Sequence, residues 1–300
     1  MNSREGIALV AKAQGSTSFQ ALEPLKRCFG TTRLGHTGTL DKFATGLLVV
    51  LLGRLTKLVP WFTALDKVYE ATVRFGEETD TLDPEGQVIG RAAPPGQKAL
   101  EEALASFRGP IMQTPPAYSS IHVDGERASD RARRGEKPDM QPRRVSIHEL
   151  ELLSYDGQDA RLRVRCSSGT YIRSLARDLA NFVGSRARLD ALSRIMVGPF
   201  SLSDARPANE FNRDDGLTSF DATIARALGF SPTTLAPRWL SVFENGGRLE
   251  PSDLGEERPL EGKFYAVFTE NGKFLGVAEG ADPYIRYRFV LSSSSDDGRA

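Results

Sequence analysis

The pattern of hydrophobic and polar positions along the chain predicts a mixture of strands and helices. Apolar and polar side chains alternate over 67–75 and over 160–166, which is typical of strands that bury one face. Over 98–107 and 172–183 the apolar side chains recur at helical spacing. The continuous apolar run 47–52 has the length of a buried strand. These segments together predict an α+β fold.

The C-terminal third has a different pattern. Residues 206–235 are interrupted by glycine and proline and predict a connector. Within 261–280, two short apolar segments flank Asn271-Gly272, a strong hairpin signal, so we expect a small all-β module over 236–292. The last residues, 293–300, are rich in serine and aspartate and predict a frayed tail.

A further segment, 125–144, is polar and rich in arginine. It predicts an exposed loop or a short helix.

Composition narrows the class of protein. Of the 300 residues, 40% are hydrophobic and 26% are charged, the balance of a soluble globular protein. Two cysteines cannot form a disulfide framework, and three widely separated histidines do not predict a metal centre. The N-terminus lacks a signal-peptide pattern, and the longest apolar run is too short to cross a bilayer. We therefore expect a cytoplasmic protein that uses no metal and no membrane.

The net charge is zero, with 39 basic and 39 acidic residues, but the charges are unevenly distributed. Residues 12–57 hold seven bases against two acids, and residues 161–194 hold eight arginines against two acids. Residues 209–300 hold ten bases against fifteen acids. The two basic segments could attract a polyanion, or their arginines could be scattered over solvated faces.

The first stretch with candidate chemistry is Gly35-His36-Thr37-Gly38-Thr39-Leu40-Asp41. Glycine permits unusual backbone angles and close approach to a ligand, and the apolar run that follows would hold this loop rigidly. Asp41 is either a catalytic carboxylate or an aspartate that caps a turn, and the second role is commoner in glycine-rich loops. His36 is either a turn residue or a group that stacks on a base.

The second stretch, Ser167-Ser168-Gly169-Thr170-Tyr171-Ile172-Arg173, lies between a predicted strand and a predicted helix. Arg173 and Arg177 share one helix face and are either solvated or available to a carboxylate or phosphate. Tyr69 begins a predicted strand, where it is either a core residue or a ring that stacks on a nucleobase.

From these residues alone, an enzyme acting on nucleic acid with a single carboxylate is possible, but no specific reaction follows. Neither a Walker motif nor a GxGxxG after a strand is present. Glycoside hydrolysis would need a second carboxylate, and none is paired with Asp41 in the sequence.

Taken in order, the motifs resemble the TruB family of bacterial tRNA pseudouridine synthases, which act on uridine 55 of the T-loop. The resemblance covers about residues 6–200 and rests on four segments: GHTGTLD with ATGLL (35–48), KVY with its downstream TDTLDPEG (67–86), QTPPAYSSI (113–121) and CSSGTYIR (166–173). The C-terminal EGKFYAVFTENGKFLGVAEG resembles a PUA-like RNA-binding module. The chain departs from the family pattern at Ala11, Ala13, Lys42 and His122, none of which is an expected catalytic group.

The resemblance implies a catalytic domain over 1–205 whose central mixed, mainly antiparallel sheet is flanked by helices, and an RNA-binding module over 236–292. It implies isomerisation of uridine to pseudouridine after the base is flipped out of the RNA. Asp41 would be the catalytic carboxylate, Arg173 would pair with it and keep it ionised, and Tyr69 would stack on the uracil and assist loss of the C5 proton. The other residues implied at the substrate are Gly35, His36, Thr37, Tyr171 and Leu192.

The resemblance also implies that the enzyme needs no cofactor. Its partner would be the T-arm stem-loop of tRNA, with phosphates contacted by both basic segments, and it would act as a monomer without an obligatory protein partner. Two other readings remain open at this point. One is an RNA-binding or tRNA-folding module in which modification is secondary or lost, and the other is an RNA-guided relative that works inside a ribonucleoprotein.

Overall fold

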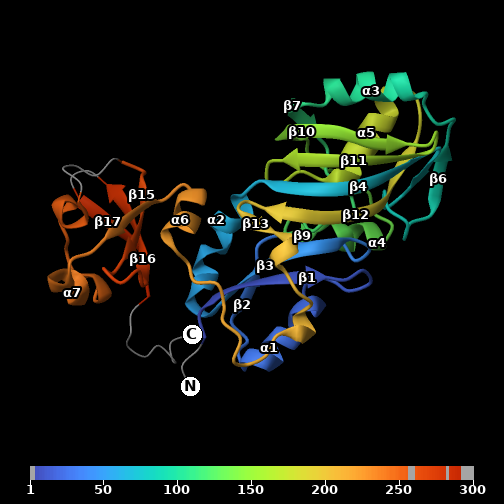
Figure 1. Ribbon diagram of the computed structural model, residues 1–300. Coiled ribbons are helices and arrows are strands. Elements are labelled where there is room, and N and C mark those ends of the chain that lie inside the picture. The colour runs from blue at the N-terminus through green and yellow to red at the C-terminus, as the bar shows by residue number, and fades with distance from the viewer. Residues whose placement is uncertain (1–3, 256–260, 282–283, 292–300) are drawn as a thin grey trace.

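The computed structural model describes residues 4–255, 261–281 and 284–291, and it contains two main sheets (Figure 1). The larger has nine strands in the order β1-β3-β12-β4-β11-β10-β7, with β2 attached to β3 and β13 attached to β12. Its strands are β1 (Gly6–Lys12), β2 (Leu34–His36), β3 (Thr45–Leu52), β4 (Lys67–Phe75), β7 (Gly109–Gln113), β10 (Arg143–Tyr155), β11 (Asp159–Cys166), β12 (Ala187–Val197) and β13 (Phe200–Ser201).

All pairs in this sheet are antiparallel except β3 with β12, which run parallel over only two residue pairs. The expected mixed, mainly antiparallel sheet is therefore confirmed. Two small hairpins stand apart from it: β5 (Glu77–Thr79) with β6 (Val88–Arg91), and β8 (His122–Val123) with β9 (Glu126–Arg127).

Helices lie beside both sheets (Figure 1). The α-helices are α1 (Glu23–Phe29), α2 (Val59–Ala64), α3 (Gln97–Ser106), α4 (Ala128–Arg133), α5 (Ile172–Phe182), α6 (Ala222–Ala227) and α7 (Leu240–Glu244). Short 3₁₀ segments cover Gln20–Leu22, Gly53–Leu58, Leu202–Asp204, Ala208–Glu210, Pro237–Trp239 and Pro251–Leu254.

Alternation along β4 and β11 decides which face of the large sheet is buried. Tyr69, Ala71 and Val73 of β4 join Leu162 and Val164 of β11 in one core. Leu175 and Leu179 of α5 belong to the same core, so α5 covers this face. The predicted strands at 67–75 and 160–166 and the helices at 98–107 and 172–183 are thus confirmed as β4, β11, α3 and α5. The arginine-rich segment 125–144 forms β9 and α4, in agreement with a short helix.

The second sheet has the order β14-β15-β16-β17 and is built from the C-terminal region (Figure 1). Its strands are β14 (Ser231–Thr234), β15 (Phe264–Phe268), β16 (Phe274–Ala281) and β17 (Tyr284–Val290). The hairpin around Asn271-Gly272 joins β15 to β16, as predicted. β14 lies in the segment predicted as a connector and pairs parallel with β15. This strand precedes the predicted boundary at 235–236, and four residues that include a proline have no alternation to reveal it. The tail predicted at 293–300 lies outside the described residues.

β3 is buried on both faces. Leu48, Val50 and Leu52 join the core shared with α5. Leu47, Val49 and Leu51 join a second core that contains Phe268 and Phe274 of the C-terminal sheet and also Phe62 of α2 and Phe220. Within the described ranges, no helix combines the length and apolar character needed to cross a membrane.

Candidate active site

The loop between β2 and β3 carries Asp41 and is fixed from the side of β1. The Lys12 ammonium donates to the carbonyl oxygen of Ala44 over 2.5 Å and to that of Ala13 over 3.0 Å. The Ser18 hydroxyl accepts from the Leu40 amide at 2.8 Å. The turn itself closes through a hydrogen bond from the Ala44 amide to the Asp41 carbonyl oxygen. The carboxylate of Asp41 is therefore not what closes the turn.

Gly46 begins the strand behind this loop at the point where β3 meets β12. Its φ of +113° lies in the region that favours glycine. A Cβ added there would lie 2.4 Å from the carbonyl oxygen of Arg194. Glycine at this position therefore permits the close approach of the two strands.

Arg173, the second residue of α5, pairs with Asp41. Its Nη2 donates to Oδ1 of Asp41 over 2.9 Å, and its Nε lies 2.9 Å from Oδ2. Nη1 donates to the Thr81 carbonyl oxygen at 2.8 Å and lies 3.4 Å from the Asp83 carboxylate, while Nη2 also donates to the Tyr118 carbonyl oxygen at 2.9 Å. The Arg173 side chain is only 3% exposed and that of Asp41 is 36% exposed. The pair thus presents a carboxylate to solvent above a buried guanidinium.

The pKa of Asp41 moves in the direction opposite to the one expected from the ion pair alone. Burial raises the pKa of Asp41 above its ordinary value, and the nearby Asp83 carboxylate raises it further. The guanidinium of Arg173 lowers this pKa but does not outweigh burial. The expected pairing is present, but it moderates an upward shift and does not produce a net downward one.

Tyr69 lies on the buried face of β4 and is 9% exposed. It is paired with Arg194 of β12 across the sheet, and burial raises the pKa of its phenol while the Arg194 guanidinium opposes that rise. Asp41 also acts electrostatically on this phenol, so the two side chains share one environment. Both the core role and a stacking role considered for Tyr69 are compatible with this position.

Tyr171 immediately precedes α5 and is held through its backbone. Its amide donates to the Gln113 side-chain oxygen over 2.8 Å, and the Gln113 side-chain nitrogen donates back to the Tyr171 carbonyl oxygen over 3.1 Å. The guanidinium carbon of Arg143 lies 5.0 Å from the centre of the Tyr171 ring. These contacts fix the tyrosine beside the start of the helix that carries Arg173.

His36 and Thr37 lead into the loop that carries Asp41. Within the described part of the chain, His36 Nδ1 and Thr37 Oγ1 are buried without a hydrogen-bond partner. Burial lowers the pKa of His36, and Arg194 adds to this effect. Gly35 pairs with Leu51 of β3, and a Cβ there would lie 2.9 Å from a methyl group of Val59. Packing against Val59 therefore accounts for glycine at that position.

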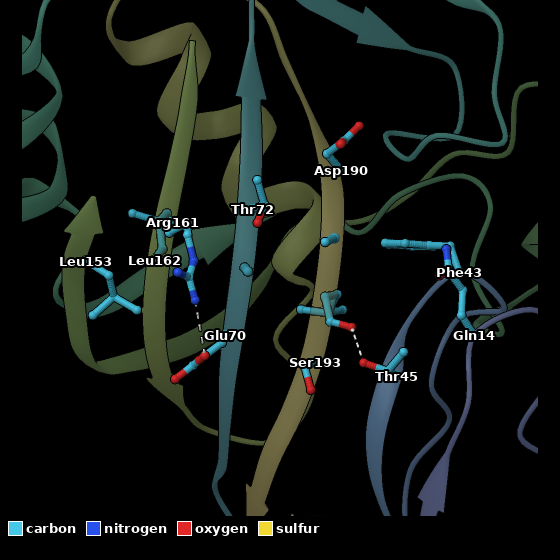
Figure 2. Close-up of a pocket in the computed structure, with 13 residues that line it drawn as sticks. Gln14, Phe43, Thr45, Glu70, Thr72, Leu153, Arg161, Leu162, Asp190 and Ser193 are labelled. Carbon is cyan, nitrogen blue, oxygen red and sulfur yellow. Dashed lines mark hydrogen bonds and ion pairs between the residues drawn. The ribbon is translucent and has the colours of Figure 1, made fainter. Parts of the chain in front are cut away.

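Leu192, on β12, lies beside a cavity of about 220 Å³ (Figure 2). The cavity is lined by Gln14, Phe43, Thr45, Glu70, Ala71, Thr72, Leu153, Arg161, Leu162, Asp190, Ala191, Leu192 and Ser193. Arg161 points toward Glu70 and lies 3.9 Å from it. Asp41 and Arg173 do not line this cavity, so the structure separates it from the carboxylate–arginine pair.

The arginines of the basic segment 161–194 have partners within the protein. Arg161 and Arg163 pair with Glu70, and Arg165 pairs with Glu149. Further ion pairs join Arg163 to Glu151, Arg165 to Asp66, Arg173 to Asp41 and Asp83, Arg177 to Asp178, Arg186 to Glu78, and Arg188 to Glu77 and Asp190. Contact of this segment with RNA phosphates stays a prediction.

Three functional candidates were missed in the sequence. Asp83 was seen only as part of the TDTLDPEG motif, and Lys12 only as the lysine of a segment that otherwise departs from the family pattern. Among the described residues, Arg194 has the largest side chain that is fully buried. It lies two positions after the inward-facing Leu192 in β12, so the alternation of the strand could have placed it on the buried face. In the described residues, no group of three or more His, Cys, Asp or Glu side chains is placed to hold a metal ion.

The fold is similar to that of chains in solved Cbf5 and H/ACA ribonucleoprotein complexes. A chain in a Cbf5–Nop10–Gar1 complex matches with a TM-score of 0.68 and 19% identity, covering 95% of this chain and 84% of that one. A chain in an H/ACA ribonucleoprotein bound to a substrate RNA matches with a TM-score of 0.70 and 18% identity, with the same coverage. At these identities the likeness establishes the fold.

The sequence comparisons establish the family. Residues 26–172 match the N-terminal domain of the TruB family pseudouridylate synthases. The tRNA pseudouridine synthase B of Borrelia garinii subsp. bavariensis is 37% identical over 95% of this chain and 98% of its own length. The enzyme of the same name from Treponema denticola is 46% identical over 80% of this chain and 83% of its own length. That of Azoarcus sp. is 36% identical over 97% of this chain and 96% of its own length. The chain is an isomerase and belongs to the TruB family of pseudouridylate synthases.

Proposed function

We propose that this enzyme converts uridine to pseudouridine at position 55 in the T-loop of tRNA, with Asp41 as the catalytic carboxylate. The observation that carries the proposal is the Asp41–Arg173 pair, in which a partly exposed carboxylate is held at two points by a buried arginine. Its relatives' names, tRNA pseudouridine synthase B, support the tRNA substrate.

The reaction needs one group that acts at the nucleoside while the base is detached. The N1–C1′ bond breaks, the uracil turns, and a C5–C1′ bond forms. The proton on C5 is lost and N1 gains one, so the reaction is an isomerisation without net redox change. Asp41 can attack C1′, add to C6 of the base, or remove the C2′ proton, and each route requires its ionised form.

The other predicted residues have roles in holding the nucleoside. A base must leave the RNA stack before it reaches the buried pair, at a cost of a few kcal/mol that stacking contacts would offset. We assign stacking and assistance in C5 proton loss to Tyr69, and the lining of the base site to Tyr171 and Leu192. His36 would occupy the space that the flipped base leaves, with Gly35 and Thr37 shaping the loop beneath it.

The domain assignment follows the same reasoning. The large sheet and its helices would form the catalytic domain, and the sheet β14–β17 would act as a PUA-like RNA-binding module. The enzyme would act in the cytoplasm as a monomer, without a protein partner. The Cbf5 chains of similar fold were solved in assemblies. Activity of the purified chain on a T-arm stem-loop transcript would test directly whether the enzyme acts without a protein partner.

The test of the function uses Asp41→Asn, which removes the carboxylate charge and keeps the side-chain shape. Unmodified tRNA is incubated with each protein, and pseudouridine is located by chemical mapping. We expect wild-type protein to modify position 55, and Asp41→Asn to bind the tRNA with wild-type affinity but form no pseudouridine. Modification by Asp41→Asn would refute the catalytic assignment, and modification only at other uridines would refute the assignment of position 55.

A further inference from the structure

Arg194 is a buried cation without a carboxylate partner. It lies on β12 and is 1% exposed. None of the ion pairs found among the described residues includes it; its Nε donates to the Leu47 carbonyl oxygen at 2.8 Å and its Nη2 donates to the Gly38 carbonyl oxygen at 3.0 Å. An uncompensated charge is costly to bury, so an apolar side chain would serve better if filling space were the only requirement.

The contacts of Arg194 join three separate elements around the candidate site. Leu47 belongs to β3, Gly38 belongs to the loop that carries Asp41, and Tyr69 on β4 is paired with Arg194 across the sheet. Gly38 has a φ of +141°, and a Cβ there would lie 3.3 Å from Nη1 of Arg194. The absence of a side chain at Gly38 lets the guanidinium lie close to the loop.

The position of Arg194 in the sheet adds to this arrangement. β3 and β12 pair only at Thr45–Ser193 and Gly46–Arg194. At this short junction, the backbone of Arg194 contacts Gly46 while its side chain reaches the loop that leads into β3. One residue therefore fixes both the strand junction and the loop.

The charge of Arg194 extends to neighbouring titratable groups. Lys12 on β1, His36 on β2 and Lys67 on β4 all have pKa values lowered, mainly by burial, and Arg194 lowers each of them further. Its guanidinium also opposes the upward shift that burial produces in the pKa of Tyr69. The charge of Arg194 therefore lies among titratable groups of β1, β2 and β4 that surround the loop of Asp41.

We propose that Arg194 is a positioning residue that holds the Gly38 turn of the catalytic loop and the Tyr69 phenol in fixed relation, so that Asp41 and Tyr69 meet the same nucleoside. This inference rests on the proposed function. It differs from the role of Arg173, because Arg194 contacts the loop backbone and the tyrosine and not the Asp41 carboxylate. Losing it would affect the chemical step more than RNA binding.

The test compares Arg194→Met, which keeps length but removes charge and donors, with Arg194→Lys, which keeps the charge. The matched control is Leu100→Ala, which opens a cavity in the same core beneath α3. Tritium released from C5 of labelled uridine in a tRNA transcript gives kcat and KM, and a thermal melt gives the folded fraction. We expect Arg194→Met to lose about 100-fold in kcat per folded molecule with KM changed less than about threefold.

Arg194→Lys should recover part of this loss, and Leu100→Ala should lower the melting temperature with kcat per folded molecule unchanged. A double-mutant cycle with Tyr69→Phe should be non-additive, since the two residues are paired across the sheet and the Arg194 charge acts on the phenol. If Arg194→Met does not fold, Arg194→Lys carries the test, with an expected loss of about tenfold in kcat at constant KM.

Wild-type kcat in Arg194→Met or Arg194→Lys, additivity with Tyr69→Phe, or a loss that follows only the folded fraction would overturn the positioning role. These outcomes are separate from failure of the proposed function. That failure would be seen as an inactive wild-type protein or an active Asp41→Asn variant.

Discussion

The Asp83 carboxylate lies 3.4 Å from Nη1 of Arg173, at the end of the guanidinium that does not contact Asp41. Asp83 is itself fixed, because its Oδ1 accepts from the Thr81 hydroxyl at 2.6 Å and from the Glu85 amide at 3.1 Å. The Arg173 guanidinium is therefore held at both ends by carboxylates. Asp83 orients the arginine that in turn contacts Asp41.

Asp83→Asn should weaken this support and change the pH profile. Without the charge of Asp83, Arg173 is less firmly oriented, and we expect kcat to fall by about 10- to 100-fold. Asp83 raises the pKa of Asp41, so its removal lowers that pKa. Since Asp41 must be ionised, the acidic limb of kcat against pH should move to lower pH. The control is Asp80→Asn, in the same turn, whose carboxylate accepts from the Gln87 amide. An acidic limb that moves upward would contradict the assignment.

Arg173→Lys should shift the pH profile the other way. An ammonium cannot reproduce the two-point contact with Asp41 and also reach Asp83 and the two backbone carbonyls. The pKa of Asp41 should rise further, so activity should be lost at a higher pH as the solution is acidified. We also expect kcat to fall by about 100-fold or more. Arg177→Lys, on the same helix and paired with Asp178, is the control. Unchanged kcat and an unchanged acidic limb would show that Arg173 does not tune Asp41.

The sequence predicted secondary structure better than it predicted contacts between residues that are far apart in the chain. The alternation of Tyr69, Ala71 and Val73 defined β4 and its buried face because that information is carried by adjacent residues. The contact between Asp41 and Arg173 joins positions 132 residues apart, and it was expected only through the family resemblance. Spacing alone left a turn aspartate and a solvated arginine as alternatives.

The contacts that support the site were harder to foresee. Arg194 falls at an inward position in β12, where an apolar residue is the ordinary expectation, and nothing in the sequence shows which carbonyl groups it bonds. The arginine-rich segment 161–194 is a similar case, because its charge balance does not identify the neighbours of each arginine. A count of charges does not reveal that Glu70 and Glu149 lie across the strands from those arginines.

Gly46→Ala should destabilise the protein through the junction of β3 and β12. The new methyl group would lie 2.4 Å from the Arg194 carbonyl oxygen and 2.5 Å from its amide nitrogen, and φ is already +113°. We expect a loss of about 2–5 kcal/mol in the free energy of unfolding, measured by urea denaturation. In Gly30→Ala, φ is +60° and no atom lies within 4 Å of the new methyl group, so only the backbone cost of about 1–2 kcal/mol applies. Equal losses in the two variants would show that the contact with Arg194 is unimportant.

The salt dependence of tRNA binding should separate free cations from paired ones. Lys42 is exposed beside Asp41, and if it contacts a phosphate, Lys42→Gln should reduce the slope of log affinity against log salt by about 1. Arg163 is paired with Glu70 on the face of β11 opposite the buried Leu162 and Val164, so Arg163→Gln should leave the slope unchanged. Affinity measured over a range of salt concentrations tests both. A reduced slope for Arg163→Gln would place RNA on that face of the sheet.

The burial of β3 on both faces makes the strand behind the Asp41 loop depend on residues that are synthesised much later. Leu47, Val49 and Leu51 pack in the same core as Phe268 and Phe274, which leave the ribosome long after β3. Until those phenylalanines emerge, the strand behind the Asp41 loop has one apolar face uncovered. We therefore expect a chain that stops before β15 to be recognised by chaperones or proteases as incomplete, so that prematurely terminated products do not accumulate as inactive competitors for RNA.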